Sequence, residues 1–165
     1  MNPMRHLMPV QRLWLGAALS LWAGAAAAEG SVLLTVVAAD GAQHEFDMAA
    51  LDALPQISFT TSTIWTDGKM TFSGPALRNV LGAGGIDKGV VHLVALNDYA
   101  VDLDLAGTDD KAPIIATRIN GAEFGVRDNG PLWIVYPFDS DLRYQDEVVY
   151  SASVWQLVRA EAVVP

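Results

Sequence analysis

One tryptophan stands in an unusual place for a core residue. Trp65 follows the threonine-rich segment 60–64 and precedes the turn signal Asp67-Gly68 by one residue. An indole beside hydroxyl groups suits a flat heteroaromatic ligand, because the ring can stack while hydroxyls and backbone groups form hydrogen bonds. An aromatic side chain that caps the edge of a sheet would give the same pattern, and composition alone favours that structural interpretation.

Other residue types that carry chemistry are scarce or badly spaced. The chain has no cysteine, which excludes thiol nucleophiles, iron–sulfur clusters and thiolate ligands to a soft metal. Beyond residue 28 only His44 and His92 remain, too few for a three-histidine metal site. The segment 102–113 begins like a calcium loop but ends in Pro113, where the bidentate glutamate is required. No Gly-x-Ser-x-Gly motif is present, which disfavours a serine hydrolase.

The first 28 residues have the pattern of a secretory signal peptide. Arg5 and Arg12 precede an apolar stretch over 13–28 that closes in four alanines. The stretch is short and alanine-rich for a membrane span, although an uncleaved anchor is the alternative. Arg12 follows a glutamine, so no twin-arginine signal exists and we expect Sec-type export. A single domain is then expected over 29–165.

Charge and length narrow the function classes. Removal of Arg5 and Arg12 from the 10 Lys and Arg leaves 8 bases against 19 acids, a net charge of −11. Such a surface repels phosphate backbones, and no basic stripe occurs, so nucleic acid is a poor partner. No second apolar run could span a bilayer, so we expect no transmembrane segment after signal cleavage. The remaining 137 of 165 residues are enough to bury a core without disulfides.

Short β-branched runs separated by Gly, Asn and Asp predict a β-rich α+β domain. Strands are expected over 31–38, 43–46, 57–64, 69–72, 90–96, 99–103, 114–119, 122–126, 132–136 and 155–163. Short helices are expected over 48–54, where Asp47 can act as N-cap, and over 76–81 after Pro75. Asn120-Gly121 is the strongest hairpin signal. The polar segment 137–150 is expected to be irregular.

Six short motifs occur together in one order. They are Thr-Thr-x-Thr-x-Trp at 60–65, Phe-x-Gly-x-x-Leu at 72–77, Asn-Asp-Tyr at 97–99, Ala-Thr-Arg-x-Asn-Gly at 116–121, Gly-Pro-Leu-Trp-Ile-Val-Tyr-Pro at 130–137 and Ser-Val-Trp-Gln-Leu at 153–157. With these motifs the chain resembles the oxidoreductase molybdopterin-binding domain, the sulfite-oxidase-type fold, across about residues 57–163. It is similar to the small exported subgroup of periplasmic pterin-binding proteins that lack the molybdenum-ligating cysteine. The resemblance implies a β-rich mixed sheet of the α+β class and a periplasmic location.

Several positions depart from the enzymes of that family. The enzymes hold molybdenum through a cysteine near Thr61 and Thr63, and neutral hydroxyls are poor substitutes for a soft thiolate. They carry an arginine where this chain has Trp133 and a lysine where it has Val154. Both cations suit the phosphate of the cofactor. Their loss and the missing twin-arginine signal indicate a molybdenum-free pterin as the ligand.

The resemblance also suggests a set of ligand-binding side chains. The predicted residues are Thr61, Thr63, Trp65, Asn97, Asp98, Tyr99, Arg118, Trp133 and Asp139. Trp65 and Trp133 are the stacking candidates. Arg118 would place its planar fork on the carbonyl and a ring nitrogen of the pterin. Asn97 and Asp98 would accept hydrogen bonds from its amino group and ring N–H.

Proteins of the resembled subgroup act as sensors beside inner-membrane signalling enzymes that make or degrade cyclic di-GMP. We therefore expect a non-catalytic pterin sensor without stoichiometric metal, and a contact surface for its partner within Phe138–Tyr150. One alternative is a molybdopterin-dependent oxidoreductase of the sulfite oxidase type that works without the thiolate. Another is a structural or adaptor domain with a vestigial pocket.

Overall fold

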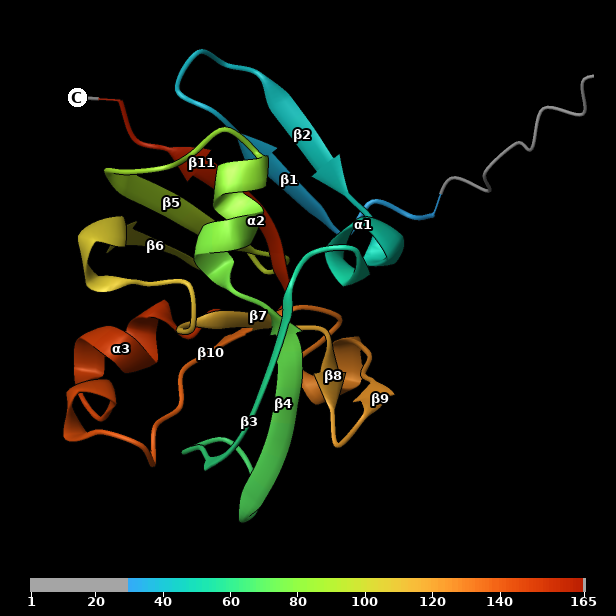
Figure 1. The fold of residues 1–165 in the computed structure, drawn as a ribbon, viewed down its shortest axis with the longest axis vertical. Coiled ribbons are helices and arrows are strands. Elements are labelled where there is room, and N and C mark those ends of the chain that lie inside the picture. Colours follow the sequence, from blue (N-terminus) through green and yellow to red (C-terminus); the bar gives the residue numbers. More distant parts are fainter. Residues whose placement is uncertain (1–29, 165) are drawn as a thin grey trace, which may run out of the picture.

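Three sheets and three short α-helices form residues 30–164, the part of the chain that the computed structural model describes (Figure 1). The expected signal peptide over 1–28 lies outside the described residues. The sheet-rich α+β class expected from the sequence is confirmed. Within residues 30–164, no helix combines the length and the apolar character that a membrane crossing requires.

The largest sheet has five strands in the order β2-β1-β11-β5-β6. Its strands are β1 (Leu34–Val37), β2 (Gln43–Phe46), β5 (Val90–Ala95), β6 (Ala100–Asp104) and β11 (Leu157–Ala162). Only the pair β1 and β11 is parallel; the neighbours within this sheet are otherwise antiparallel. The turn between β1 and β2 forms as expected, because Gly41 has a φ of 85° and the Ala42 N–H donates to Asp40 Oδ1 at 2.9 Å.

The two smaller sheets share one stretch of chain. The four-stranded sheet contains β3 (Gln56–Ser62), β4 (Lys69–Pro75), β8 (Arg118–Ile119) and β9 (Ala122–Glu123), and the two-stranded sheet contains β7 (Ile114–Ala116) and β10 (Trp133–Val135). The single strand expected over 114–119 is therefore wrong. It divides at Thr117, because β7 pairs with β10 while β8 pairs with β4. The hairpin turn at Asn120 and Gly121 forms as expected, with φ values of 52° and 83°.

Strand β4 passes so closely over β7 that it requires a glycine. A Cβ on Gly74 would lie 1.9 Å from the carbonyl oxygen of Ile115. This contact explains why the strand tolerates no side chain at this position. Strand β4 continues to Pro75, three residues beyond the expected end at Phe72, because its last three residues pair with residues 56–58 of β3.

The first two helices begin near the expected residues. Helix α1 (Met48–Asp52) is capped by Asp47, whose Oδ1 accepts the Ala50 N–H at 2.8 Å. Helix α2 (Leu77–Ala83) lies over the large sheet and buries Leu77, Val80 and Leu81 (Figure 1). That spacing of three and four residues places one apolar face toward the core.

The segment expected to be irregular contains helix instead. A 3-10 helix η3 (Leu142–Tyr144) and the α-helix α3 (Glu147–Ala152) occupy most of its second half. Two aspartates account for the difference, since Asp141 and Asp146 each cap one of these helices with a side-chain oxygen. Two further 3-10 turns, η1 (Leu105–Gly107) and η2 (Val126–Asp128), lie in the described connections.

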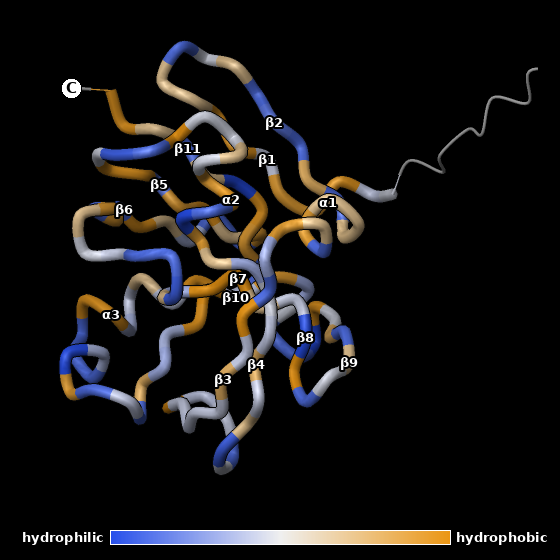
Figure 2. The backbone as a smooth tube through the Cα atoms, in the orientation of Figure 1, coloured by the Kyte–Doolittle hydropathy of each residue, from blue (hydrophilic) through white to orange (hydrophobic). Residues whose placement is uncertain are grey.

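The most apolar part of the chain lies at the middle of the molecule. Figure 2 shows hydrophobic colours on β7 and β10 at the centre, and every residue of these two strands is buried. The β3–β4 hairpin extends away from this centre, with α3 on one side of it and β8 and β9 on the other (Figure 1). The candidate site lies between the loop of this hairpin and α3.

Candidate ligand-binding site

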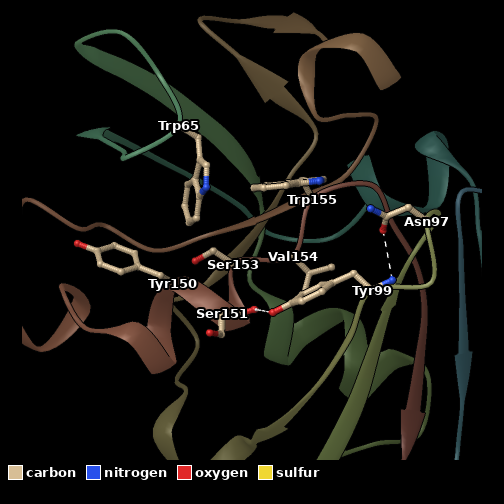
Figure 3. A pocket seen from close by; sticks show the side chains of 8 residues that line it. All are labelled: Trp65, Asn97, Tyr99, Tyr150, Ser151, Ser153, Val154 and Trp155. Carbon is tan, nitrogen blue, oxygen red and sulfur yellow. Dashed lines mark hydrogen bonds between the residues drawn. The ribbon is translucent and has the colours of Figure 1, made fainter.

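A cleft of about 330 Å³ opens between the β3–β4 loop, the β5–β6 turn and α3. Four aromatic side chains and four smaller residues surround it (Figure 3). The lining residues are Trp65, Asn97, Tyr99, Tyr150, Ser151, Ser153, Val154 and Trp155. The volume falls at the lower end of the range for small-molecule sites in proteins.

The ring of Trp65 stands nearly at right angles to two other rings of the cleft. The centroid of Trp65 lies 5.6 Å from that of Trp155 at an interplanar angle of 82°, and 6.0 Å from that of Tyr150 at 88°. Such edge-to-face contacts fix the rings without covering both of their faces. The cleft therefore offers a flat ligand one face for stacking and a second ring edge for contact.

Threonine hydroxyls hold Trp65 in place. The backbone N–H of Trp65 donates to Thr63 Oγ1 at 3.1 Å, and the hydroxyls of Thr63 and Thr66 are 2.9 Å apart. The sequence placed Thr63 in contact with the ligand. The structure instead gives this hydroxyl two partners within the loop, so Thr63 orients Trp65.

The β5–β6 turn brings two predicted residues into the cleft and leaves a third outside. Asp98 has a φ of 64° at the tip and does not line the cleft. The Tyr99 N–H donates to Asn97 Oδ1 at 3.2 Å, and the Tyr99 hydroxyl donates to the carbonyl of Ser151 at 2.9 Å. The second bond ties the turn to α3 (Figure 3). The amide nitrogen of Asn97 has no hydrogen bond to another described residue, so it can serve a ligand.

Trp133 lies behind the lining residue Ser153 and does not itself line the cleft. This indole is 1% exposed, and its Nε1 donates to the carbonyl of Ser153 at 3.2 Å. Ser153 in turn donates its hydroxyl to the carbonyl of Val149 at 2.8 Å. Burial leaves Trp133 without a free face for stacking in this cleft, which corrects the expectation from the sequence. Its role is to support Ser153 and the neighbouring Trp155.

Arg118 lies apart from the cleft and is engaged elsewhere. Its Nη1 and Nη2 donate to Oδ1 and Oδ2 of Asp52 at 2.6 and 2.8 Å, a bidentate pair that joins β8 to α1. These hydrogen bonds raise the pKa of Arg118 and lower the pKa of Asp52. The guanidinium fork is thus already satisfied by a carboxylate, and the structure does not place it where a ligand in the cleft would lie.

Thr61 and Asp139 form a separate cluster at the base of the hairpin. The Asp139 N–H donates to Thr61 Oγ1 at 3.0 Å, while the Asp139 carboxylate accepts the N–H and the hydroxyl of Ser62 at 3.0 and 2.5 Å. Lys69 Nζ lies 3.1 Å from the same carboxylate. The bonds from Ser62, followed by Lys69, lower the pKa of Asp139 to about 2. Both predicted residues join the hairpin to the segment after β10 and do not line the cleft.

Five lining residues were absent from the predicted site. They are Tyr150, Ser151, Ser153, Val154 and Trp155. The sequence signal for Trp155 was present, since it belongs to the closing motif that carries the resemblance. The signal for Tyr150 was the cap at Asp146, which turns its segment into a helix.

A second hollow of about 470 Å³ lies against Trp65 and Trp133 from another side. Arg127 and Asp128 of η2 lie at its border.

Among residues 30–164, no three His, Cys, Asp or Glu side chains gather as a metal-binding group. The potential ligands near Thr61 are hydroxyls and the carboxylate of Asp139, and the full sequence contains no cysteine to serve a soft metal.

The chain matches no protein-family model and no curated protein. Among solved structures, it is similar to the crystal structure of the sulfane dehydrogenase SoxCD from Paracoccus pantotrophus, with a TM-score of 0.59 and 15% sequence identity. The similarity covers 78% of this chain and 37% of that one. At this identity the likeness shows a shared fold and nothing finer.

Proposed function

We propose that the aromatic cleft binds a molybdenum-free pterin and that the protein is a non-catalytic periplasmic binding protein of the sulfite-oxidase-type fold. The observation that carries this proposal is the combination of four aromatic rings with neutral polar groups around about 330 Å³. A pterin is flat and electron-poor, and hydrogen-bond donors and acceptors border its two rings. Stacking on an electron-rich indole suits such a ring system.

The free polar groups of the cleft match the edge of a pterin. The indole N–H groups of Trp65 and Trp155 and the amide nitrogen of Asn97 have no hydrogen bond to other described residues, so they can donate to the carbonyl and ring nitrogens. The hydroxyls of Ser151 and Ser153 can accept from the amino group. Every one of these groups is neutral, as is the pterin ring at neutral pH.

The complete molybdenum cofactor fits this site poorly. Its phosphate requires cationic partners, but none of the eight lining residues is Lys or Arg. At the position of the enzymes' lysine, the buried Val154 lines the cleft. Thr61, near the position of their cysteine, is fully buried and hydrogen-bonded to Asp139. The alternative of a molybdopterin-dependent oxidoreductase is supported by the likeness in fold to a dehydrogenase, and the donor set counts against it.

A binding protein without catalysis needs a readout, and we assign it the role of a sensor. The resemblance to the exported subgroup suggests an inner-membrane signalling enzyme of cyclic di-GMP metabolism as the partner. A pterin can change the activity of such a partner only if bound and free forms of the sensor contact it differently. The proximity of the cleft to α3 supports such a difference.

The direct test is the chemical content of protein purified from its native envelope. Mass spectrometry of released small molecules should find a pterin near one per chain, and elemental analysis should find no stoichiometric molybdenum. One molybdenum per chain would establish the oxidoreductase alternative. Protein that carries no small molecule and binds no added pterin would leave the structural or adaptor role.

A further inference from the structure

A larger cleft lies on the other side of α3. It measures about 530 Å³ and is bounded by β6, η1, η3 and α3. Its walls are mostly apolar and include Leu103, Tyr144, Val148 and Val149. We call it the α3 cleft. None of its lining residues belongs to the aromatic cleft described above.

One polar group inside the α3 cleft has no partner. Tyr136 is 4% exposed and lines the cleft, yet its hydroxyl has no hydrogen bond to any other residue within 30–164. Burial raises the pKa of Tyr136 well above its usual range, so the hydroxyl stays protonated and acts as a donor. No fully buried side-chain nitrogen or oxygen among residues 30–164 lacks a hydrogen bond, so the Tyr136 hydroxyl reaches the solvent of the cleft, where a carbonyl group on an incoming molecule can accept it.

The border of the α3 cleft exposes apolar side chains. Leu142 of η3 is 81% exposed and Val148 of α3 is 74% exposed, the highest values for large hydrophobic residues among those described. Val148 lines the cleft, and Leu142 directly precedes Arg143, which also lines it. A patch that extends from a cleft onto the surrounding surface is typical of contact with a macromolecule, since a small ligand would cover only the interior.

Carboxylates outnumber bases around this patch. Asp104 lines the cleft, and Asp141 and Asp146 cap the two helices that border it. The single base on the lining is Arg143, which lies over the Tyr144 ring at 4.6 Å and 3.7 Å from the Asp141 carboxylate. The local charge is therefore negative, in keeping with the chain as a whole, and favours a positively charged partner.

We propose that the α3 cleft docks a basic, amphipathic segment of a partner protein. An apolar anchor of that segment enters between Val148 and Leu103, and one of its backbone carbonyls accepts the Tyr136 hydroxyl. Lysine or arginine side chains next to the anchor face Asp104, Asp141 and Asp146. This arrangement buries an apolar centre within a polar rim, as specific interfaces do.

Helix α3 connects this docking site to the aromatic cleft. Tyr150 and Ser151 line the aromatic cleft, whereas Val148 and Val149 line the α3 cleft. Contacts between aromatic rings also connect the two clefts. The ring centroids of Trp65 and Tyr150 are 6.0 Å apart, and those of Tyr150 and Phe138 are 5.6 Å apart. The centroid of Phe138 lies 6.2 Å from that of Tyr136. A ligand that fixes Tyr150 thus acts on the helix that forms the docking site. This coupling rests on the proposed function; docking itself does not.

Site-specific photo-crosslinking in cells that naturally make the protein tests the docking site. A photoreactive phenylalanine analogue replaces Leu142 or Val148, and matched controls replace Ile64 or Val126, which are also exposed but lie elsewhere. We expect one partner protein to be crosslinked from positions 142 and 148 only, through a peptide that contains an apolar residue flanked by Lys or Arg. Val148→Lys, made with the probe at 142, should reduce that product at least tenfold.

Several results would overturn the docking site. One is equal crosslinking from all four positions, and another is the absence of any product from positions 142 and 148. Products that contain only lipid or small molecules, or a crosslinked peptide that is acidic, would also contradict it. The same experiment in a Trp155→Ala background separates the two proposals. A product that persists there while pterin binding is lost supports docking but removes the coupling. Pterin binding to wild type without any product contradicts docking and leaves the proposed function intact.

Discussion

Asp139 stabilises the site although it does not line the cleft. Its carboxylate accepts two hydrogen bonds from Ser62 and pairs with Lys69, while its backbone N–H donates to the buried Thr61. These contacts join the base of the β3–β4 hairpin to the chain after β10. Because Trp65 lies in the loop of that hairpin, the position of this proposed stacking residue depends on the junction.

The ionised form of Asp139 should make stability depend on pH. Its pKa in the folded protein is about 2, below the value of about 3.9 for an unfolded aspartate. The unfolded state therefore binds more protons between these values, so the contribution is complete above about pH 4 and is lost as pH falls toward 2. Urea unfolding at pH 5 and pH 2.5 measures the free energy of unfolding at both values. The decrease between pH 5 and pH 2.5 should be smaller for Asp139→Asn than for wild type.

The control for this prediction is Asp98→Asn. Asp98 is exposed, and its carboxylate forms no hydrogen bond or ion pair with other described residues. This variant should lose as much stability as wild type between pH 5 and pH 2.5. An equal loss in Asp139→Asn and wild type would mean that the carboxylate contacts contribute nothing in solution.

Of the residues predicted from the sequence, Trp65, Asn97 and Tyr99 line the aromatic cleft. Trp155 was not predicted, because spacing reveals which side chains are unusual and not which face each other. Trp133 and Trp155 both lie in motifs of the resemblance, and only the pairing of β10 with β7 decides that the first is buried. Arg118 looked free in the sequence because its partner Asp52 is 66 residues away. Long-range contacts of this kind leave no local signal.

The crossing of β4 over β7 determines how the β3–β4 hairpin reaches the cleft. Gly74 allows the two backbones to approach, since any Cβ there would overlap the carbonyl oxygen of Ile115. The turn signals at Asp40-Gly41 and Asn120-Gly121 were sufficient to predict two hairpins. The division of segment 114–119 was not predictable, because both halves have strand propensity and differ only in their partners.

Gly74→Ala should destabilise the fold strongly. The methyl group would meet backbone atoms that cannot move without separating β4 from β7, so we expect a loss of at least about 2 kcal/mol in the free energy of unfolding. Gly107→Ala is the matched control, because no atom lies within 4 Å of its added Cβ. That variant should remain within about 0.5 kcal/mol of wild type. Equal stability of the two variants in urea unfolding would contradict the close packing of these strands.

At the scale of the whole molecule, residues 30–164 form a sheet-rich structure in which the aromatic cleft and the α3 cleft share a short helix. Its likeness in fold to a sulfane dehydrogenase covers 37% of that enzyme's chain, so this protein resembles a part of it. The sequence predicted the α+β class through its turns and β-branched runs. The helix between the clefts was missed, because three of its six residues, Val148, Val149 and Tyr150, are of types that favour strands.

The proposed location can be tested on the intact protein. The signal-peptide pattern over residues 1–28 predicts a mature chain that begins near Ala28 or Glu29. N-terminal sequencing of protein from a periplasmic extract should find this start. Recovery of the chain with Met1 intact in the cytoplasmic fraction would contradict export and with it the periplasmic role.

Titration calorimetry with a panel of pterins tests the central claim most directly. The panel contains oxidised, dihydro and tetrahydro forms of neopterin and biopterin, and the proteins are wild type, Trp155→Ala and Arg118→Ala, each shown to be folded by circular dichroism. Wild type should bind at least one pterin, and Trp155→Ala should bind it about tenfold to a hundredfold more weakly, a loss of about 1–3 kcal/mol. Arg118→Ala should match wild type, because Arg118 is paired with Asp52 away from the cleft. Absence of binding by wild type at millimolar pterin, or equal affinity of Trp155→Ala, would contradict the assignment of the aromatic cleft as a pterin site.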